Sequence, residues 1–218
     1  MATVIAESLK SRFAELQSWR DQNWSPAQLE KNAGQRRKLV ERFDPSAIAQ
    51  PGETLLPYTF GSSDGEQIAL DDLVANGPAI LVFFRFATCP ACNIALHYYE
   101  EALQPVLHER GVPLVALSPQ ISERLGAIKE KQGLSFIVAS DADSIVARDL
   151  GIAFVPDDRP SPPPAGWIGE ILGNDRWELP QPTVVIVDQE RTVRWIKVSP
   201  DWLDRPEADE ILAALDEI

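Results

Sequence analysis

The sequence is poor in residues that build covalent or metal frameworks: its 218 residues include two cysteines, two histidines and one methionine. Two cysteines cannot form the disulfide network that holds small secreted proteins together. No uninterrupted apolar run approaches the roughly 20 residues of a membrane-spanning helix. The opening MATVIAESLKSR lacks the basic start, apolar stretch and cleavage site of a secretion signal, in that order. We therefore expect a cytoplasmic protein without a membrane partner.

The charge balance is strongly acidic, with 33 Asp and Glu against 20 Lys and Arg and a formal net charge of −13. Nucleic acids and anionic membranes would be repelled by this charge, which disfavours both as partners. The 44% of hydrophobic residues is enough for one sizeable core. The charge is unevenly distributed: residues 1–42 carry eight basic and five acidic residues, a net +3, which leaves −16 for the remainder.

The N-terminal segment has the pattern of two helices. Ile5, Leu9, Phe13 and Leu16 lie close to helical spacing and Trp19 follows them. A second helix is indicated by WSPAQLEKNAGQRRKLVERF, in which a serine N-cap precedes a proline at the first helical position. We interpret the pair as an arm used for packing or for forming a homodimer, with a lid over an active site as the alternative. We expect this extension over residues 1–48 and one further domain over residues 49–218.

Short apolar runs alternate with amphipathic stretches after residue 50, the pattern of an α/β sheet. The expected strands are AILVFF (79–84), VPLVAL (112–117), FIVAS (136–140), TVVIVD (183–188) and VRWIKV (193–198). The expected helices are Asn93–Glu109, Ser122–Gln132, Ser144–Leu150 and Pro206–Leu215. Residues 155–182 form a long loop, because their prolines exclude regular structure over most of that length.

Both cysteines occur in the stretch ILVFFRFATCPACN, where an expected strand gives way to an expected helix. Cys89 then precedes the helix N-terminus, where free N–H groups and the helix dipole stabilise a thiolate. Pro90 suits the first helical position, and Arg85 could add positive charge. Cys92 lies about one turn further along, close enough to form a disulfide with Cys89. We expect Cys89 at an exposed position as the nucleophile and a shielded Cys92 that resolves the intermediate.

The order of elements, the C-x-x-C at the strand-to-helix junction and the Pro182-Thr183 pair that opens a later strand resemble the thioredoxin fold. The fold class implied is α/β, a central mixed sheet flanked by helices, with an N-terminal helical extension. The resemblance also implies a cis Gln181–Pro182 peptide bond that faces the thiols. PGETLLPYTFGSSDGEQIALDDL, VALSPQ, ASDADSIVARDLGIAF and WIKVSPDWLDRPEADEILAAL resemble more narrowly the peroxiredoxin-like branch of the alkyl hydroperoxide reductase and thiol-specific antioxidant family, over roughly residues 50–215.

The sequence departs from the motifs of both families. Peroxiredoxins carry P-x-x-x-T-x-x-C, and the alignment places Arg85 at the proline, Cys89 at the threonine and Cys92 at the peroxidatic cysteine. Peroxiredoxins also carry an arginine just before the later strand, and ELPQPTVV has none immediately there. Thioredoxins carry a buried acidic residue whose position is occupied here by Phe83, so that acid is absent. Family position therefore favours Cys92 as the nucleophile toward a peroxide, whereas position at the helix start favours Cys89 for disulfide exchange.

The function we expect is a thiol-dependent antioxidant oxidoreductase that uses no cofactor and no metal. Its substrate would be a small peroxide or a protein disulfide, and an external dithiol such as a thioredoxin would reduce the Cys89–Cys92 disulfide. The residues assigned to catalysis are Cys89, Cys92, Arg85 and Pro182.

Two alternatives compete with this interpretation. Cys89, Cys92, His97 and His108 have a spacing that matches no standard zinc finger, but a structural metal module stays open. A non-catalytic thioredoxin-fold scaffold with an inert cysteine pair is the other. Among the remaining features, we interpret the Asp141 and Asp143 turn as structural, and Trp167 and Trp177 as anchors of the loop or walls of a substrate groove.

Overall fold

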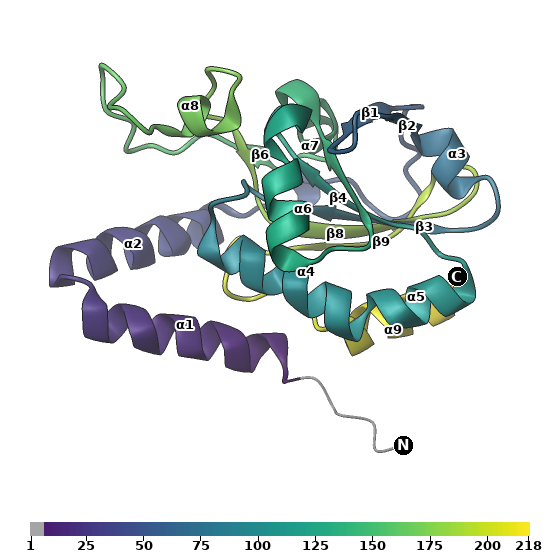
Figure 1. Ribbon diagram of the computed structural model, residues 1–218, viewed down its shortest axis with the longest axis horizontal. Coiled ribbons are helices and arrows are strands. Elements are labelled where there is room, and N and C mark those ends of the chain that lie inside the picture. The colour runs from purple at the N-terminus through teal and green to yellow at the C-terminus, as the bar shows by residue number, and fades with distance from the viewer. Residues whose placement is uncertain (1–6) are drawn as a thin grey trace.

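The computed structural model describes residues 7–218 and contains a central mixed sheet of seven strands (Figure 1). The strand order is β2-β1-β5-β4-β3-β8-β9. The strands are β1 (Thr59–Ser62), β2 (Gln67–Ala69), β3 (Ala79–Phe83), β4 (Leu114–Ser118), β5 (Ile137–Ser140), β8 (Thr183–Val187) and β9 (Val193–Val198). Strands β3, β4 and β5 are parallel, and the remaining pairs are antiparallel. A separate two-stranded sheet pairs β6 (Ala153–Phe154) with β7 (Leu179–Pro180).

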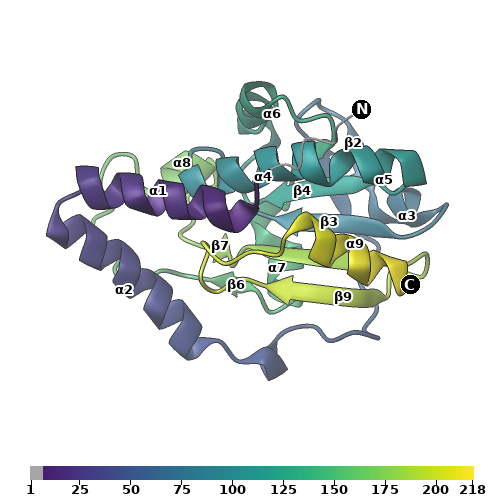
Figure 2. The same cartoon turned by 90° about the horizontal axis from the view of Figure 1, so that it is seen from below.

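Helices cover both faces of the large sheet (Figure 2). They are α1 (Leu9–Asn23), α2 (Pro26–Arg42), α3 (Leu70–Val74), α4 (Pro90–Ala102), α5 (Gln104–Arg110), α6 (Gly126–Gln132), α7 (Ile145–Asp149), α8 (Ile168–Leu172) and α9 (Ala208–Asp216). Three short 3-10 turns span Pro45–Ala47, Ser122–Arg124 and Ala142–Ser144. Side chains alternate along β3: Ile80 and Val82 pack toward α1, α4, α5, α6 and α9, and Leu81 and Phe83 pack toward α3 and α7.

The thioredoxin-like α/β fold with N-terminal helices is confirmed, and several boundaries differ from the prediction. The expected helix over 93–109 is two helices, because Pro105 falls in the first turn of α5 and the chain turns at Leu103. The expected helix at Ser122 starts as a 3-10 turn before α6. The loop over 155–182 contains α8 and β7 but is otherwise irregular, as its prolines predict. Ser25 caps α2 in a complete capping box.

Helix α1 packs beside α4 through an apolar edge (Figures 1 and 2). Leu9 and Phe13 are 0% and 3% exposed and belong to the same buried cluster as the residues of α4. The carboxylate of Glu207 accepts hydrogen bonds from the N–H groups of Leu9 and Lys10, at 2.8 and 2.9 Å. The packing arm is therefore confirmed for α1. Ile5, which we assigned to the same pattern, lies outside the described residues.

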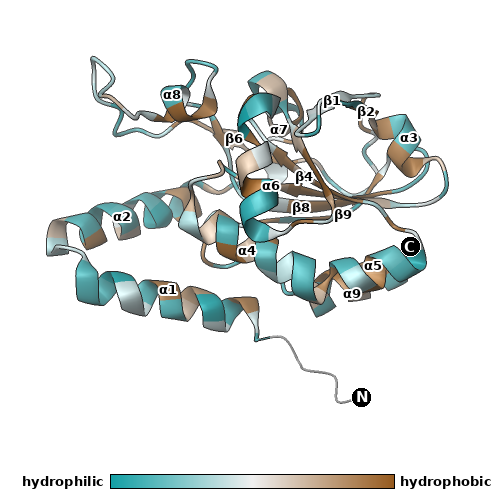
Figure 3. Cartoon of the chain, in the orientation of Figure 1, coloured by the Kyte–Doolittle hydropathy of each residue, from teal (hydrophilic) through white to brown (hydrophobic). Residues whose placement is uncertain are grey.

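Helix α2 buries none of its side chains and is hydrophilic along most of its length (Figure 3). It is joined to the long loop by ion pairs from Lys31 to Asp158, at 3.2 Å, and from Arg42 to Asp157, at 2.6 Å. The homodimer and the domain boundary at residue 48 stay predictions. Over residues 7–218, no helix combines the length and the hydrophobicity needed to cross a bilayer.

The docking of α1 can be tested through its buried aromatic residue. We expect Phe13→Ala to lower the free energy of unfolding by about 3 kcal/mol, because a buried ring is lost and a cavity remains. Trp19→Ala is the matched control, since Trp19 on the same helix is 56% exposed, and it should change stability by less than about 0.5 kcal/mol. Urea unfolding followed by circular dichroism measures both. Equal effects of the two substitutions would mean that α1 is not docked as described.

Candidate active site

The two cysteines occupy the first turn of α4, where the sequence predicts them. Strand β3 ends at Phe83, Cys89 is the N-cap of α4 and Pro90 is its first residue. The preceding loop is held by the Asn93 side-chain amide, which donates to the carbonyl groups of Ala87 and Cys89 at 2.7 and 2.8 Å. The thiols are thus held at a helix start whose free N–H groups and dipole favour negative charge.

Both thiols are free and both are buried, Cys89 at 3% exposure and Cys92 at 0%. The expectation of an exposed Cys89 is therefore wrong. The physical reason is tertiary: Leu9 and Phe13 of α1, together with Trp202 from the segment after β9, pack into the same buried cluster as the two cysteines. The start of a helix exposes its N-cap only when nothing else packs over it.

Arg205 lies against the thiols and is only 8% exposed. Its Nη2 donates to the Cys92 sulfur at 3.5 Å, and its Nε donates to the Trp202 carbonyl at 3.0 Å. The guanidinium group also lies 5.7 Å from the centre of the Phe13 ring. This residue was missed because it is 113 positions from Cys92. One signal was present: Arg205 is the only basic residue in an otherwise acidic segment over 198–218.

Arg85 is the second cation next to the cysteine pair. Its guanidinium group lies over the ring of Trp202 at 4.4 Å and near the ring of Phe86 at 5.3 Å. Its Nε atom is buried and has no hydrogen-bond partner among the described residues. Trp202 therefore lies between the two cations: its carbonyl group holds Arg205 and its ring packs on Arg85.

The local hydrogen bonds and charges shift the pKa values of the two thiols in opposite directions. For Cys92, burial raises the pKa, but the hydrogen bond from Cys89 and the charges of Arg205 and Arg85 outweigh burial and leave the pKa well below its usual value. For Cys89, the hydrogen bond to Cys92 and then burial raise the pKa. In the reduced pair, negative charge is therefore favoured at Cys92 over Cys89.

Pro182 is buried at the start of β8, and the cis peptide bond expected before it is wrong. Within residues 7–218 the cis bond is Ser161–Pro162, and Gln181–Pro182 is trans. Gln181 donates its N–H to the Ile152 carbonyl and Pro182 accepts from the Ser199 N–H, both at 2.8 Å. The first bond continues the pairing of β6 with β7, and the second continues the pairing of β8 with β9. The chain from β7 to β8 makes both bonds in an extended conformation with a trans Gln181–Pro182 peptide bond.

The metal alternative is not supported by the geometry. Among residues 7–218, no three or more His, Cys, Asp or Glu side chains gather as metal ligands. The His97 ring contacts the Gln132 carbonyl at 3.3 Å and Glu101 at 3.4 Å. His108 lines a surface pocket with Gln104 and Phe136, and neither cysteine lines that pocket. The interpretation of Asp141 as structural is confirmed, since its carboxylate accepts hydrogen bonds from the N–H groups of Val146 and Ala147 in the first turn of α7.

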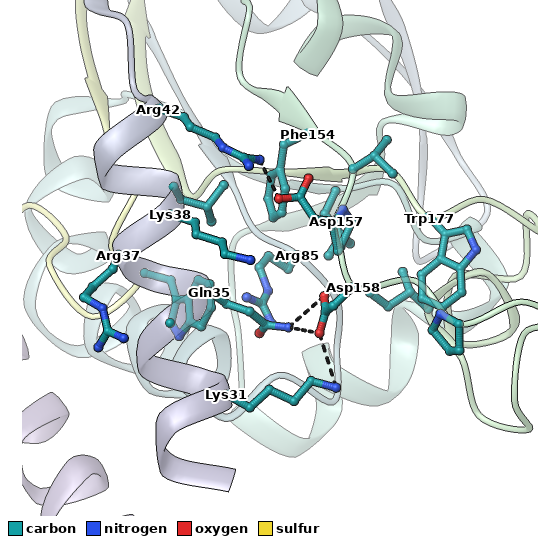
Figure 4. A pocket seen from close by; sticks show the side chains of 18 of the residues that line it. Lys31, Gln35, Arg37, Lys38, Arg42, Arg85, Phe154, Asp157, Asp158 and Trp177 are labelled. Atoms are coloured by element: carbon teal, nitrogen blue, oxygen red, sulfur yellow. Dashed lines mark hydrogen bonds and ion pairs between the residues drawn. The ribbon is translucent and has the colours of Figure 1, made fainter. Parts of the chain in front are cut away.

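A pocket of about 720 Å³ lies between α2 and the long loop, and Arg85 forms part of its wall (Figure 4). Trp167 and Trp177 line it, as one of the two interpretations of these residues predicts, and Trp202 and Phe154 add further aromatic surface. Because Arg85 and Trp202 belong both to the pocket wall and to the surroundings of the thiols, the pocket is adjacent to the cysteine pair. The α2 side of this arrangement corresponds to the lid that we considered for the N-terminal helices.

Comparison with known proteins identifies relatives of the main part of the chain. A sequence model of the AhpC/TSA family matches residues 51–196. Peroxiredoxin Bcp of Escherichia coli (strain K12) is 28% identical over 102 residues, which cover 46% of this chain and 64% of the relative. The chain thus spans somewhat less than two thirds of that curated relative.

Solved structures support the same fold. Peroxidoxin BcpB from Mycobacterium tuberculosis superposes with a TM-score of 0.60 at 21% identity, covering 78% of this chain and 97% of that structure. The bacterioferritin comigratory protein of Xanthomonas campestris gives a TM-score of 0.57 at 18% identity, covering 76% and 98%. The segment that matches the family ends before Trp202 and Arg205 and begins after α1 and α2.

The role of Arg205 predicts a change in thiol acidity. We expect Arg205→Met to raise the pKa of the more acidic thiol by about one unit or more, because an opposite charge in contact with it is removed. Titration of the thiolate absorbance near 240 nm measures this pKa, and near-ultraviolet circular dichroism checks the fold.

Two further variants make the titration specific. Arg205→Lys should restore part of the shift, since the charge is kept. Arg194→Met removes a charge from the exposed side of β9 and should leave the titration unchanged. An unaltered titration in Arg205→Met would show that Arg205 does not stabilise the thiolate.

Proposed function

This chain belongs to the AhpC/TSA family, and we propose on that premise that it is a thiol-dependent peroxidase in which Cys92 attacks the peroxide and Cys89 resolves the product. The observation that carries the proposal is the hydrogen bond from Arg205 to the sulfur of Cys92. The resemblance of the sequence to the family motif also aligns Cys92 with the peroxidatic cysteine, which supports this choice of nucleophile. Hydrogen bonding and charge favour the thiolate at Cys92 over Cys89, which reverses the assignment suggested by helix position alone.

The first step is attack of the Cys92 thiolate on the nearer oxygen of the peroxide. The O–O bond breaks, the sulfur is oxidised to a sulfenic acid, and the distal oxygen leaves as an alkoxide or hydroxide that takes up a proton. Negative charge moves from sulfur to the departing oxygen during this step. Arg205 and Arg85 lie beside the sulfur and stabilise that charge, as an arginine and a threonine do in typical family members.

The second step joins the two cysteines. The Cys89 sulfur attacks the sulfenic acid of Cys92, a disulfide forms, and water leaves with the thiol proton. Cys89 is the N-cap of α4 and Cys92 lies in its first turn, so the two side chains are close in the reduced protein. An external dithiol such as a thioredoxin then reduces the disulfide through a mixed disulfide, which restores both thiols and leaves the reductant oxidised.

A small peroxide suits this site better than a protein disulfide does. Both sulfurs are covered, at 3% and 0% exposure, and a folded protein substrate cannot reach them without displacement of α1 or the segment around Trp202. The same cover has to open when the external dithiol reduces the Cys89–Cys92 disulfide. We also propose that the protein forms a homodimer and is located in the cytoplasm. The net charge of −13 disfavours nucleic acids as partners of this protein.

The experiment compares the wild type with Cys89→Ser and Cys92→Ser in stopped-flow reactions with hydrogen peroxide and cumene hydroperoxide. We expect Cys92→Ser to lose at least a thousandfold in rate, because the nucleophile is gone. Cys89→Ser should still react once and accumulate a sulfenic acid that dimedone traps and mass spectrometry detects.

The reaction with an oxidised model disulfide, run in parallel, separates the alternatives. Disulfide exchange that is lost in Cys89→Ser, without any peroxide reactivity, would replace the peroxidase with a thioredoxin-type reductase. Thiols that react with neither oxidant until the protein unfolds would identify a non-catalytic scaffold.

The pH dependence of the reaction gives a separate prediction. Because the pKa of Cys92 is lowered in the folded protein, its thiolate is lost only as the pH falls through that lowered value. The second-order rate constant with peroxide should therefore rise with pH up to the lowered pKa and then stay level through pH 8.5. A rate that continues to rise through pH 8.5, the value of an ordinary thiol, would contradict the assignment of Cys92.

A further inference from the structure

One buried cation on the N-terminal extension has no role in the reaction steps described above. Arg20 lies in the last turn of α1 and is only 4% exposed. Its Nε and Nη1 atoms are buried and have no hydrogen-bond partner in the part of the chain that the structure describes. Its guanidinium group lies over the ring of Trp24, 4.9 Å from the ring centre. Burying a guanidinium group without an anion is costly, so the position of Arg20 requires a physical reason.

The orientation of α1 brings Arg20 toward the start of α4. The two helices lie side by side and run in opposite directions (Figures 1 and 2). Arg12, near the start of α1, pairs with Glu101 near the end of α4 at 2.6 Å. Phe13 belongs to the same buried cluster as the two cysteines. Arg20 follows Phe13 by about two helical turns, so it lies on the same face of α1 and closer to the first turn of α4.

The charges around Arg20 single out Cys89 as its counterpart. Burial lowers the pKa of Arg20, and the charge of Cys89 is the strongest influence that raises it. The charges of Arg36 and Arg85 lower the same pKa. Arg36 is itself paired with Asp201 at 3.2 Å. Of the three groups that act on Arg20, only Cys89 can carry negative charge, and it does so when its thiol loses a proton.

The other two cations near the thiols have contacts of their own. Arg205 donates to the sulfur of Cys92 at 3.5 Å, and Arg85 packs on the ring of Trp202 at 4.4 Å. In the reduced pair, hydrogen bonding to Cys92 and then burial raise the pKa of Cys89, and the charges of these two arginines lower it by less. Once Cys92 is a neutral sulfenic acid, its negative charge is gone. The positive charge around the pair then favours a thiolate at Cys89.

We propose that Arg20 is a further residue of the reaction, whose charge stabilises the Cys89 thiolate while that sulfur attacks the sulfenic acid of Cys92. This inference rests on the proposed function and assigns a chemical role to the N-terminal extension. The S–S bond forms, the S–O bond breaks, and the departing hydroxide takes up the proton that Cys89 has released, which gives water. Arg20 lowers the cost of this proton release, because a buried thiolate has lost its hydration.

The charge interaction is tested without turnover, in Cys92→Ser, where Cys89 is the only cysteine. We expect Arg20→Met to raise the pKa of Cys89 by about one unit, because a nearby opposite charge is removed. Arg20→Lys should restore part of the shift. Arg12→Met removes the same charge from the same helix at the far end of α4, and it should leave this pKa unchanged. The ultraviolet absorbance of the thiolate measures the titration, and the three tyrosines do not interfere because their pKa values are raised.

The chemical role is tested by the rate at which the sulfenic acid becomes a disulfide after one addition of hydrogen peroxide. Below the pKa of Cys89, Arg20→Met should form the disulfide about threefold more slowly, since an about tenfold lower thiolate fraction is partly offset by a more nucleophilic thiolate. Above that pKa, the variant should be at least as fast as the wild type. A purely structural effect would slow the reaction at every pH. Slower disulfide formation should also increase the yield of sulfinic acid at excess peroxide, which mass spectrometry detects.

The outcomes separate this proposal from the one on which it rests. An unchanged pKa of Cys89 in Arg20→Met, or equal slowing at every pH, overturns the role of Arg20 while the peroxidase stands. A raised pKa in a protein that does not react with peroxide supports the interaction of Arg20 with Cys89 and overturns the peroxidase together with its resolving step. Near-ultraviolet circular dichroism checks that each variant is folded, and Arg20→Gln replaces Arg20→Met if the latter is not.

Discussion

The hydrogen bond between Arg205 and Cys92 is the interaction around which the site is organised. A thiolate with no exposed surface is stable only if a cation replaces the water that it has lost. Arg205 is itself buried; burial lowers its pKa, and the charge of Cys92 and the hydrogen bond to it raise that pKa by more. Each charged group therefore offsets the free-energy cost of burying the other. The segment after β9, which holds Arg205 through the Trp202 carbonyl, becomes part of the site for this reason.

Charge complementarity also explains the N-terminal helices. Their excess of positive charge meets a strongly acidic domain through Arg12 and Glu101, Lys31 and Asp158, Arg36 and Asp201, and Arg42 and Asp157. Most of these pairs are partly exposed and individually contribute little. Together with the buried edge of α1 they orient the helices, so that α1 covers the cysteine pair and α2 borders the pocket. The extension thus forms part of the candidate site, although it lies outside the segment that matches the family.

The proposed chemistry places two demands on this arrangement that oppose each other. Exclusion of water strengthens the action of the arginines on the thiolate and on the departing oxygen. Reduction of the disulfide by an external dithiol requires access to the same sulfurs. The fold meets the first demand in the reduced state, with Cys89 and Cys92 both covered. In the proposed cycle, formation of the Cys89–Cys92 disulfide also removes the thiolate charge that compensates Arg205.

The sequence by itself determined the α/β fold, the cysteine pair at the start of α4 and the serine cap of α2, because these follow from hydrophobic periodicity and from hydrogen bonds between residues close in the chain. Only the tertiary structure decided that Cys89 is buried, that the acidic thiol is Cys92, that Gln181–Pro182 is trans and that Arg205 belongs to the site. Burial and electrostatic potential at a sulfur atom depend on every group within a few ångströms. At this site those groups come from α1, from the loop after β3 and from the segment after β9, which no local pattern connects.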